Sequence, residues 1–596
     1  MHRRQLGNGV VERLEARRLL SGAVANLNVS KLLGNQAEGA IAVDRADPSK
    51  MFVATNLDVG DGLMAGMSSD GGHTWTHRTM ANDQDGLPAA CCDPSATFDS
   101  FGNLFLAYLN NNTNAVVVLR STDAGKNFTL LKEFHGNIDQ PTITTGSGEV
   151  WVSWDSPDGI AVSGASDTSL GVTGDFSKEQ VLPGSSKGAF GDIAIGSAGQ
   201  VMATYQKPAG KASKIYVNVD ADGLGPGGFG KQILVSSTQT GDFDYLSAQP
   251  NRGIDAEVGL AFDRSGGAFN GRVYLVYTDQ TPATENSDIF LRYSDTNGAN
   301  WSNPIRVNDD STLTTQMLPK IAIDNTTGKV AVGWYDARND LSAGSPGDTD
   351  RKVNDDVEYY AALVTPASYG LLVSPNVQVS TSPSNAAAAQ SGIDLGDYTG
   401  LDFHQGVVHP LWFDNSNSTN DNPDGTLKDL DAYTANIATA TFPAATVASP
   451  GGLTDPTGPV AALNFAGGAN SGFVRRGTSY TISVRYQDAN GVDKSSISSD
   501  DLLVTGPSGF SRPAQLLRIK TRRGGVALAT YRVINPAGKF TAAQGGTYQI
   551  VLQPGQVKDP DGDASTAGVL GTFAVTTGGA GSHIGVKAPK HRHEQD

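Results

Sequence analysis

Short segments of small and apolar residues recur along most of the chain, each followed by a turn and by a second segment that ends in an aromatic residue. The short runs and the frequent turn residues predict β-strands in pairs and no long helices. Seven copies of this pattern occur, and they start at Glu38, Asp93, Gln140, Gly191, Glu257, Leu318 and Gly396. A repeat of roughly 50 to 80 residues with paired strands is typical of β-propeller blades, and not of helical solenoids.

The composition of the repeats predicts how their strands pack. The first strand of each copy favours Ala, Ser, Thr and Gly, as expected where strands converge on an axis and space is limited. Near the end of the second strand in six of the copies, a large ring is expected to fill the gap between neighbouring sheets; these rings are Tyr108, Trp154, Tyr205, Tyr277, Trp334 and Trp412. We therefore predict an all-β chain with a seven-bladed propeller over residues 25–445. The apolar segment at 24–29 is expected to pair beside the strand containing Tyr433 and to close the last blade.

The segments outside the repeats differ in composition. Residues 446–458 form a Pro/Gly-rich linker, and alternating strands over 459–577 predict an immunoglobulin-like β-sandwich. Residues 578–596 are poor in apolar residues and are predicted to be a disordered tail. Residues 1–24 contain LEARRLLSG without an apolar core and resemble the LEPR-XLL-type N-terminal segment of bacterial extracellular proteins. The resemblance implies an extracellular or cell-surface location, whereas a basic arm without such a role is the alternative.

Charge and cysteine content exclude several classes of function. A net charge of −17 argues against nucleic acid as a partner, because phosphate backbones are bound by clustered Lys and Arg. No apolar run approaches the roughly 18 residues of a membrane-spanning helix, so we expect a soluble or surface-attached monomer. The only cysteines, Cys91 and Cys92, are adjacent, which excludes a disulfide framework and a multi-cysteine zinc site. They form either a vicinal disulfide or two reduced, buried thiols.

A second motif follows the paired strands in three of the copies. SSDGGHTW and STDAGKNF match each other, and SDTNGANW is a variant; the motif residues are Ser68, Asp70, Gly72, Trp75, Ser121, Asp123, Gly125, Phe128, Ser294, Gly298 and Trp301. The Asp side chains can accept hydrogen bonds from turn amides, and the glycines permit tight backbone geometry. The motif resembles the Asp box, or BNR repeat, of sialidase-like β-propellers, where it is a turn between the third and fourth strands. The box occurs in propellers of several activities, so it indicates the fold more than the chemistry.

The sialidase resemblance implies a catalytic set. A sialidase binds a carboxylate through three arginines and uses a Tyr nucleophile with a Glu and an Asp. Strand direction places the starts of first strands and the ends of second strands on one face. The matching residues on that face are Tyr398, Glu257 and Asp93, with Arg252 and Arg338, and Arg306 or Arg351 as further candidates. Arg45, Arg120, Arg264, Arg272 and Arg292 are assigned to the opposite face. The first arginine of the family's pattern is missing, because NVSKLLGNQAEGAIAVD contains none.

The predicted face is acidic, and this feature favours other ligands. It includes Glu38, Asp93, Asp192, Glu257 and Asp397 at strand starts and Asp155, Asp279, Asp336 and Asp414 after second strands. Carboxylate clusters suit Ca²⁺, which we consider as a cofactor. Candidate ligands are Asp421, Asp424, Asp429 and Asp431, the stretch 336–350, and Asp559, Asp561 and Asp563. None has EF-hand spacing, so solvated turn aspartates are the alternative.

Two hypotheses of function follow. The first is an exported, sialidase-like propeller that binds a carbohydrate or a surface protein without catalysis. The second is an active exo-sialidase or related glycoside hydrolase that uses a Tyr nucleophile and an arginine cluster. The missing arginine and the acidic face favour the first hypothesis, because an anionic sugar would be repelled there.

Overall fold

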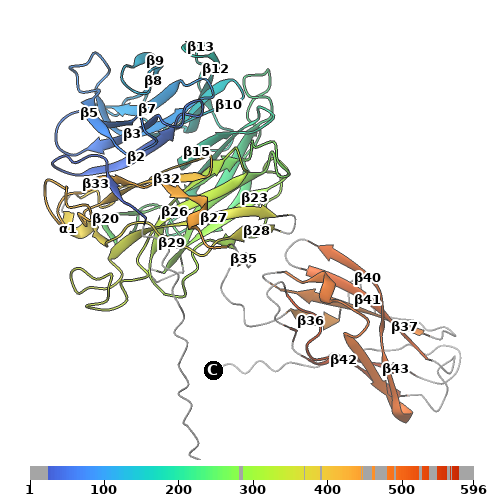
Figure 1. The fold of residues 1–596 in the computed structure, drawn as a ribbon. Coiled ribbons are helices and arrows are strands. Elements are labelled where there is room, and N and C mark those ends of the chain that lie inside the picture. The colour runs from blue at the N-terminus through green and yellow to red at the C-terminus, as the bar shows by residue number, and fades with distance from the viewer. Residues whose placement is uncertain are drawn as a thin grey trace, which may run out of the picture. The chain divides into compact units, whose positions relative to one another are not determined.

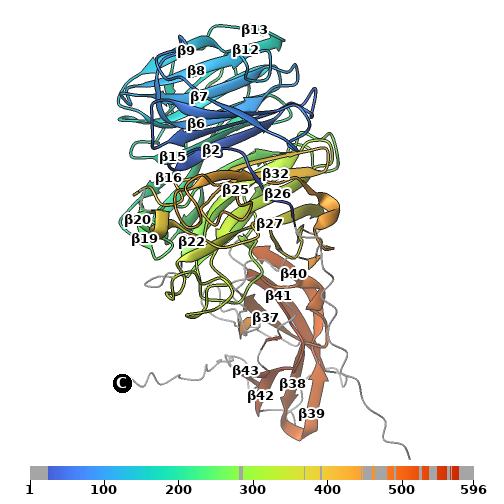
Figure 2. The ribbon, with the colours of Figure 1, turned by 60° about the vertical axis from the view of Figure 1, so that its left-hand side comes forward.

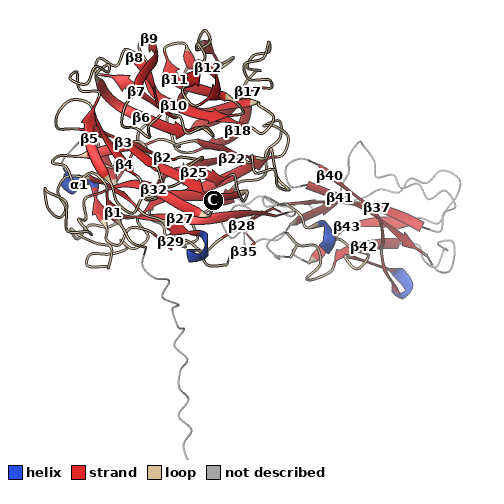
Figure 3. Ribbon diagram, turned by 45° about the horizontal axis from the view of Figure 1, so that its top comes forward, coloured by secondary structure: helices blue, strands red, loops and turns tan. Residues whose placement is uncertain are grey.

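The structure is a computed structural model that describes residues 24–280, 286–367, 370–389, 392–444, 446–447, 459–463, 479–488, 491–522, 526–535, 546–559, 564–565 and 567–575. The chain forms two compact units, one of residues up to 302 and 306–448, the other of residues from 449 onward with 303–305. The described residues are almost entirely strand and loop (Figure 3). Their helices are one α-helix, α1 (Ala386–Ala389), and three 3-10 helices of three residues each, Thr439–Thr441, Lys494–Ser496 and Pro507–Gly509. No described helix has the length and apolar character that crossing a lipid bilayer requires.

The first four sheets of the first unit follow the chain in order. Their strands are β2 (Gln36–Val43), β3 (Met51–Leu57), β4 (Leu63–Ser68) and β5 (Thr76–Met80); β6 (Ala90–Phe98), β7 (Leu104–Asn110), β8 (Ala115–Ser121) and β9 (Thr129–His135); β10 (Asp139–Gly146), β11 (Glu149–Ser156), β12 (Gly159–Ser169), β13 (Val172–Thr173) and β14 (Gln180–Val181); and β15 (Ala189–Ile195), β16 (Val201–Pro208), β17 (Ser213–Asp220) and β18 (Ile233–Thr238). Within each sheet the pairing is antiparallel.

A two-stranded insertion, β19 (Asp244–Leu246) and β20 (Gln249–Ile254), precedes the remaining three sheets. These contain β21 (Gly259–Phe262), β22 (Val273–Gln280), β23 (Ser287–Ser294) and β24 (Ile305–Arg306); β25 (Gln316–Asp324), β26 (Lys329–Asp336), β27 (Asp356–Ala367), β28 (Gly370–Val373), β29 (Val377–Gln378), β30 (Ser384–Asn385) and β35 (Thr446–Val447); and β31 (Gly400–His404), β32 (Val407–Asp414), β33 (Asp431–Thr434), β34 (Ile437–Ala438) and β1 (Leu27–Asn28).

The seven sheets are arranged as a closed ring. Their first strands lie beside one another in the order β2, β6, β10, β15, β21, β25 and β31, and β31 contacts β2 again (Figures 1 and 2). The N-terminal strand β1 belongs to the last sheet of the ring, where it pairs with β33 so that Asn28 lies opposite Tyr433. The predicted pairing of this N-terminal segment is confirmed. Asn28 and Ser30 also donate to the carboxylate of Asp431, at 2.6 and 2.9 Å.

The aromatic residues predicted to pack between sheets are all buried, and five of them, all but Trp334, belong to hydrophobic clusters that include residues of the preceding sheet. All six are at most 2% exposed, and the set is Tyr108, Trp154, Tyr205, Tyr277, Trp334 and Trp412. Trp412 stacks on Tyr359 of the preceding sheet, with ring centroids 5.5 Å apart. Burial of such rings supplies much of the apolar contact between neighbouring sheets.

The three repeated motifs form equivalent turns between third and fourth strands. The hydroxyl of Ser68 accepts the backbone N–H of Gly72, and Ser121 and Ser294 do the same for the glycine four residues on, at 2.9 to 3.0 Å. Asp70, Asp123 and, in the variant, Thr296 accept the backbone N–H four residues later, at 2.8 to 2.9 Å. The glycines have φ between 79° and 90°, which explains why glycine stands there.

The second unit contains two four-stranded sheets. One has the order β36 (Val460–Leu463), β37 (Ser479–Gln487), β41 (Val526–Ile534) and β40 (Gln515–Arg522); the other has β39 (Phe510–Pro513), β38 (Leu502–Gly506), β42 (Gly546–Leu552) and β43 (Gly568–Val575). Residues from both sheets, including Tyr480, Tyr548 and Phe573, form one hydrophobic core. Stacking of Tyr480 and Tyr548 on Phe573, at 4.1 and 5.0 Å, joins the two sheets.

Candidate functional site

A backbone irregularity recurs at the start of the first strands. Six of the seven sheets have a residue other than glycine there with φ between 39° and 57°, namely Glu38, Asp93, Gln140, Phe190, Glu257 and Leu318. In five of these sheets the pairing register shifts at the same point. A left-handed conformation costs such a residue about 1 to 2 kcal/mol, and bulges commonly redirect side chains next to functional sites. Its repetition at one end of the ring points to a site there.

The first strands line a cavity of about 460 Å³. One end is lined by Gln140, Glu257, Lys320 and Tyr398, all near the starts of first strands. The other end is lined by Arg45, Arg264, Asp402 and His404, at the ends of first strands or just after them. Arg45 pairs with Asp402 at 2.6 Å. The arginines that the sequence assigns to the opposite face thus include two at this second end.

Arg252 organises the carboxylates around the first end, which we call the opening. Its guanidinium donates two hydrogen bonds to Asp397, Nε to Oδ1 at 2.6 Å and Nη2 to Oδ2, and lies 3.4 Å from Glu38. Glu38 accepts the backbone N–H of Asp397 at 3.1 Å. Arg252 comes from the β19–β20 insertion, and Asp394 accepts its backbone N–H at 2.8 Å. The insertion therefore supplies the cation that partly balances Glu38 and Asp397.

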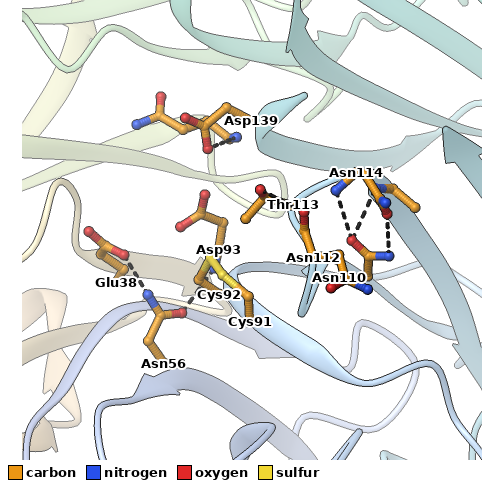
Figure 4. The surroundings of a disulfide bond; sticks show 12 residues. Glu38, Asn56, Cys91, Cys92, Asp93, Asn110, Asn112, Thr113, Asn114 and Asp139 are labelled. Atoms are coloured by element: carbon orange, nitrogen blue, oxygen red, sulfur yellow. Dashed lines mark hydrogen bonds between the residues drawn. A yellow bond between two sulfur atoms is a disulfide. The ribbon is translucent and has the colours of Figure 1, made fainter. Parts of the chain in front are cut away.

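Asn56 connects Glu38 to the neighbouring sheet. Its side-chain N–H donates to Glu38, and its carbonyl oxygen accepts the backbone N–H of Asp93 at 2.9 Å (Figure 4). Glu38 and Asp93 are 4% and 6% exposed. The amide thus holds two buried acidic residues, each in a left-handed conformation, in fixed relative positions.

Tyr398 and Lys320 complete the opening. The phenolic O–H of Tyr398 donates to Asp93 at 3.4 Å, a long hydrogen bond. The ammonium of Lys320 lies 3.2 Å from Glu257 and 5.4 Å from the centroid of the Tyr398 ring. The structure therefore brings together four of the sequence-predicted residues, Asp93, Arg252, Glu257 and Tyr398.

Burial alters the protonation of these groups. It raises the pKa of Glu38 to about 7, with Asp397 acting in the same direction and Arg252 opposing it. It raises the pKa of Glu257 to about 7 against the opposing effect of Lys320, and that of Asp93 well above its usual range. Burial and the charge of Asp93 also raise the pKa of the Tyr398 phenol. The opening can therefore hold carboxylic acids that donate protons near neutral pH.

The pKa values of Glu38 and Glu257 are higher in the folded protein than in the unfolded chain. These two carboxyl groups therefore contribute most to the free energy of unfolding below pH 4.5, and their contribution is lost as the pH rises through about 7. A shift of this size corresponds to roughly 3 kcal/mol for one independent group. We expect the Tm of the first unit to fall between pH 5 and pH 8.5 in a thermal unfolding series. Glu38→Gln, which cannot ionise, should flatten this dependence. A Tm that rises over this interval in the wild type would contradict the assignment.

Cys91 and Cys92 form a disulfide, with a Cα–Cα distance of 3.8 Å. Of the two alternatives that the sequence leaves open, the structure contains the oxidised one. The pair immediately precedes Asp93 in β6, and both residues are partly exposed beside the opening (Figure 4). A covalent link between adjacent side chains reduces backbone freedom, so it helps to hold Asp93 in its left-handed conformation.

The remaining predicted arginines lie elsewhere. Arg338 contacts Asp336 and Asp309 at 2.7 Å and lies 4.4 Å from the Tyr360 ring. Arg306 pairs with Asp288 and Asp310, and Arg351 is exposed. In the described part of the chain, Arg252 is the one arginine that forms ion pairs with Glu38 and Asp397. The structure thus does not assemble the predicted arginine cluster.

The aspartates predicted as calcium ligands near the end of the ring bind the N-terminal segment. Asp421 forms an ion pair with Lys31 at 2.8 Å. Asp424 accepts a hydrogen bond from Gly34, and Asp429 accepts one from Asn35. Asp431 accepts hydrogen bonds from both Asn28 and Ser30. Among the described residues, these four carboxylates do not converge on one point. Their contacts indicate a role in closing the ring. Asp559 is buried in the second unit, and Asp561 and Asp563 lie outside the described residues.

Sequence reasoning did not identify Asn56 and Lys320. Lys320 had a detectable signal, because it is a charged residue within LPKIAID, where the other first strands carry small or apolar residues. Asn56 lies near the end of the second strand of the first repeat, β3, and nothing in the local pattern distinguishes it from a surface residue. Its role depends on a contact between two sheets.

Similarity to known proteins was found in solved structures. No protein-family model and no curated protein matches the chain. Among solved structures, the Hadza microbial sialidase Hz136 aligns at 10% identity with a TM-score of 0.35, covering 66% of this chain and 75% of the sialidase. The α-L-arabinofuranosidase Arb93A from Fusarium graminearum aligns at 10% identity with a TM-score of 0.35, covering 52% of this chain and 92% of that one. The Penicillium chrysogenum α-L-arabinanase aligns at 11% identity with a TM-score of 0.34, covering 52% and 94%.

Proposed function

We propose that the first unit is a seven-bladed β-propeller of the sialidase-like, Asp-box type and that the second is an immunoglobulin-like sandwich. Support comes from the closed order of first strands and from the three equivalent turns between third and fourth strands. Support for the sandwich comes from two four-stranded sheets that share a core. We also propose an extracellular or cell-surface location, which the Cys91–Cys92 disulfide supports because disulfides persist in oxidising compartments.

We propose that the opening binds an uncharged or cationic saccharide. The observation that carries this proposal is the repeated left-handed residue at the start of the first strands. Of these residues, Gln140 and Glu257 line one end of the cavity, and Tyr398, which donates a hydrogen bond to Asp93, lines the same end. Carboxylates and amides accept hydrogen bonds from sugar hydroxyls, and Tyr398 offers a ring on which a sugar can pack. Residues in such strained backbone conformations cluster at ligand-binding sites in proteins, so their repetition here supports a binding role for the opening.

An anionic sugar fits the opening less well. Its carboxylate would need several arginines as hydrogen-bond donors. Arg252 already donates two hydrogen bonds to Asp397. Glu38, Asp93 and Glu257 would repel it whenever they are ionised. Arg338, the other arginine of the predicted clamp, is committed to Asp309 and Asp336.

A glycan array on the full chain tests the proposal. We expect binding to neutral or amino-sugar glycans, a loss of at least about tenfold in affinity for Glu257→Gln or Tyr398→Ala, and no change for Asp47→Asn, a partly exposed carboxylate on the β2–β3 turn. We also expect no turnover of a fluorogenic sialoside. Selective binding of sialylated glycans, or sialoside hydrolysis that disappears in Tyr398→Phe, would contradict the proposal.

Glycoside hydrolysis is a second candidate, and one observation favours it. Glu38 and Glu257 each have a pKa of about 7. They lie at the same opening as Asp397, which forms an ion pair with Arg252. Carboxyl groups held in different environments are the usual requirement for acid and base roles on a glycosidic bond. The raised pKa of Tyr398 disfavours a phenolate nucleophile. A carboxylate-based reaction on a neutral substrate therefore fits better than the sialidase reaction, and screening aryl glycosides of neutral sugars would detect it.

A further inference from the structure

The loop between β26 and β27, residues 337–355, contains carboxylates that the opening does not use. Oxygen atoms of Asp340, Asp348 and Asp356 all lie within 4.8 Å of one another. Asp350, Asp355 and Asp356 form an overlapping group with the same spacing. Such proximity of like charges is unfavourable unless protons or cations compensate for it.

A protein cation compensates the second group and not the first. Lys352 pairs with Asp350 and, at 3.5 Å, with Asp355. Among the described residues, no lysine, arginine or histidine forms an ion pair with Asp340, Asp348 or Asp356. The first group is therefore the one that requires an external cation.

The environment of Asp340 is independent support for a ligand. Its side chain is 0% exposed. One oxygen, Oδ2, accepts the backbone N–H groups of Asp355 and Asp356 at 3.0 and 3.2 Å, whereas the buried Oδ1 has no hydrogen-bond partner. A buried carboxylate oxygen without a partner is costly, and such atoms are rare in folded proteins. A bound cation would satisfy it.

The loop holds the other two carboxylates in place. Thr349 donates its backbone N–H and its hydroxyl to Asp356, at 2.7 and 2.6 Å. Asp348 accepts the backbone N–H groups of Gly344, Asp350 and Arg351. Each carboxylate oxygen has two lone pairs, so these bonds leave capacity for a metal ion.

We propose that Asp340, Asp348 and Asp356 bind a Ca²⁺ ion. Ca²⁺ is bound by six to eight oxygen ligands, carboxylates among them, at about 2.4 Å. One oxygen from each of the three aspartates lies within 4.8 Å of the others, which is close enough for them to share one ion. Mg²⁺, with ligands at about 2.1 Å, requires a smaller and more regular shell. The ion would brace the loop against β30, because Asp356 pairs with Asn385. The site is separate from the proposed saccharide-binding opening and does not depend on it.

Calcium titration of the full chain tests this site. The protein is treated with EDTA, the chelator is removed, and CaCl₂ or MgCl₂ is added in calorimetry and in thermal unfolding. We expect 1 mM CaCl₂ to raise the Tm by about 3 °C or more, and MgCl₂ to have a clearly smaller effect.

Variants locate the ion. Asp340→Asn and Asp348→Asn should each abolish the calcium heat and the Tm shift. Asp348 lies in the loop and is only partly buried, so its variant tests the site even if Asp340→Asn folds poorly. Asp421→Asn, in the other acidic stretch, is the control and should retain both signals. The absence of calcium binding in the wild type, an equal response to Mg²⁺, retention of binding in both loop variants, or its loss in Asp421→Asn would overturn the proposal.

Discussion

Replacing Arg252 with alanine is expected to lower the free energy of unfolding by about 2 to 4 kcal/mol. The change leaves Asp397, whose side chain is 5% exposed, without the two hydrogen bonds from Arg252 and leaves Glu38 beside it without a cation. Breaking a fully buried ion pair costs roughly 3 to 5 kcal/mol, and Arg252 is 35% exposed, so a somewhat smaller loss is expected. Chemical denaturation, with the loss read from the first unit, measures it.

A double variant distinguishes electrostatics from packing. Adding Asp397→Asn to Arg252→Ala removes the unpaired charge and should recover part of the lost stability. Arg351→Ala, which removes an exposed arginine, is the matched control and should have little effect. If Arg252→Ala is as stable as Arg351→Ala, the opening is not held together by this ion pair.

Deleting residues 1–30 is expected to lower the Tm of the first unit by about 5 °C or more and to promote aggregation. The deletion removes β1, exposes the edge of β33, and leaves Asp431 without Asn28 and Ser30. It also removes Val29, which is 1% exposed in the core. Thermal unfolding with light-scattering detection measures both effects.

Deletion of residues 1–23, which retains β1, is the matched control. We expect its Tm to remain close to that of the full chain. Equal Tm values for the two truncated proteins would show that the strand does not contribute to closing the ring.

Much of the fold could be predicted because the repeat is encoded locally. The aromatic residue near the end of six of the second strands, such as Trp334 or Trp412, is a single large side chain at a fixed position in the repeat, and each is buried. Ser68 and Gly72 specify a turn through bonds within five residues. The extra short strands, such as β13, β28 and β34, were not predicted, because two to four residues carry too little pattern.

The site could be predicted only in part, because its contacts join distant segments. Strand direction alone places Asp93, Glu257 and Tyr398 on one face. The pairing of Arg252 with Asp397, however, depends on an insertion whose path the repeat does not specify. Arg338 lies on the expected side of its sheet but has acidic neighbours, Asp309 and Asp336, that hold it there. The repeat pattern thus predicts the face of the ring on which a side chain lies, but it does not predict which neighbouring side chains form ion pairs with it.

A crystal structure of the protein with the saccharide that binds best on the array tests most directly whether the opening is a saccharide-binding site. We expect density for the sugar at the opening, with hydroxyl groups within hydrogen-bonding distance of Glu38, Asp93 or Glu257 and a ring in contact with Tyr398. Sugar bound at the other end of the cavity, near Arg45 and Arg264, or on the second unit, would contradict it.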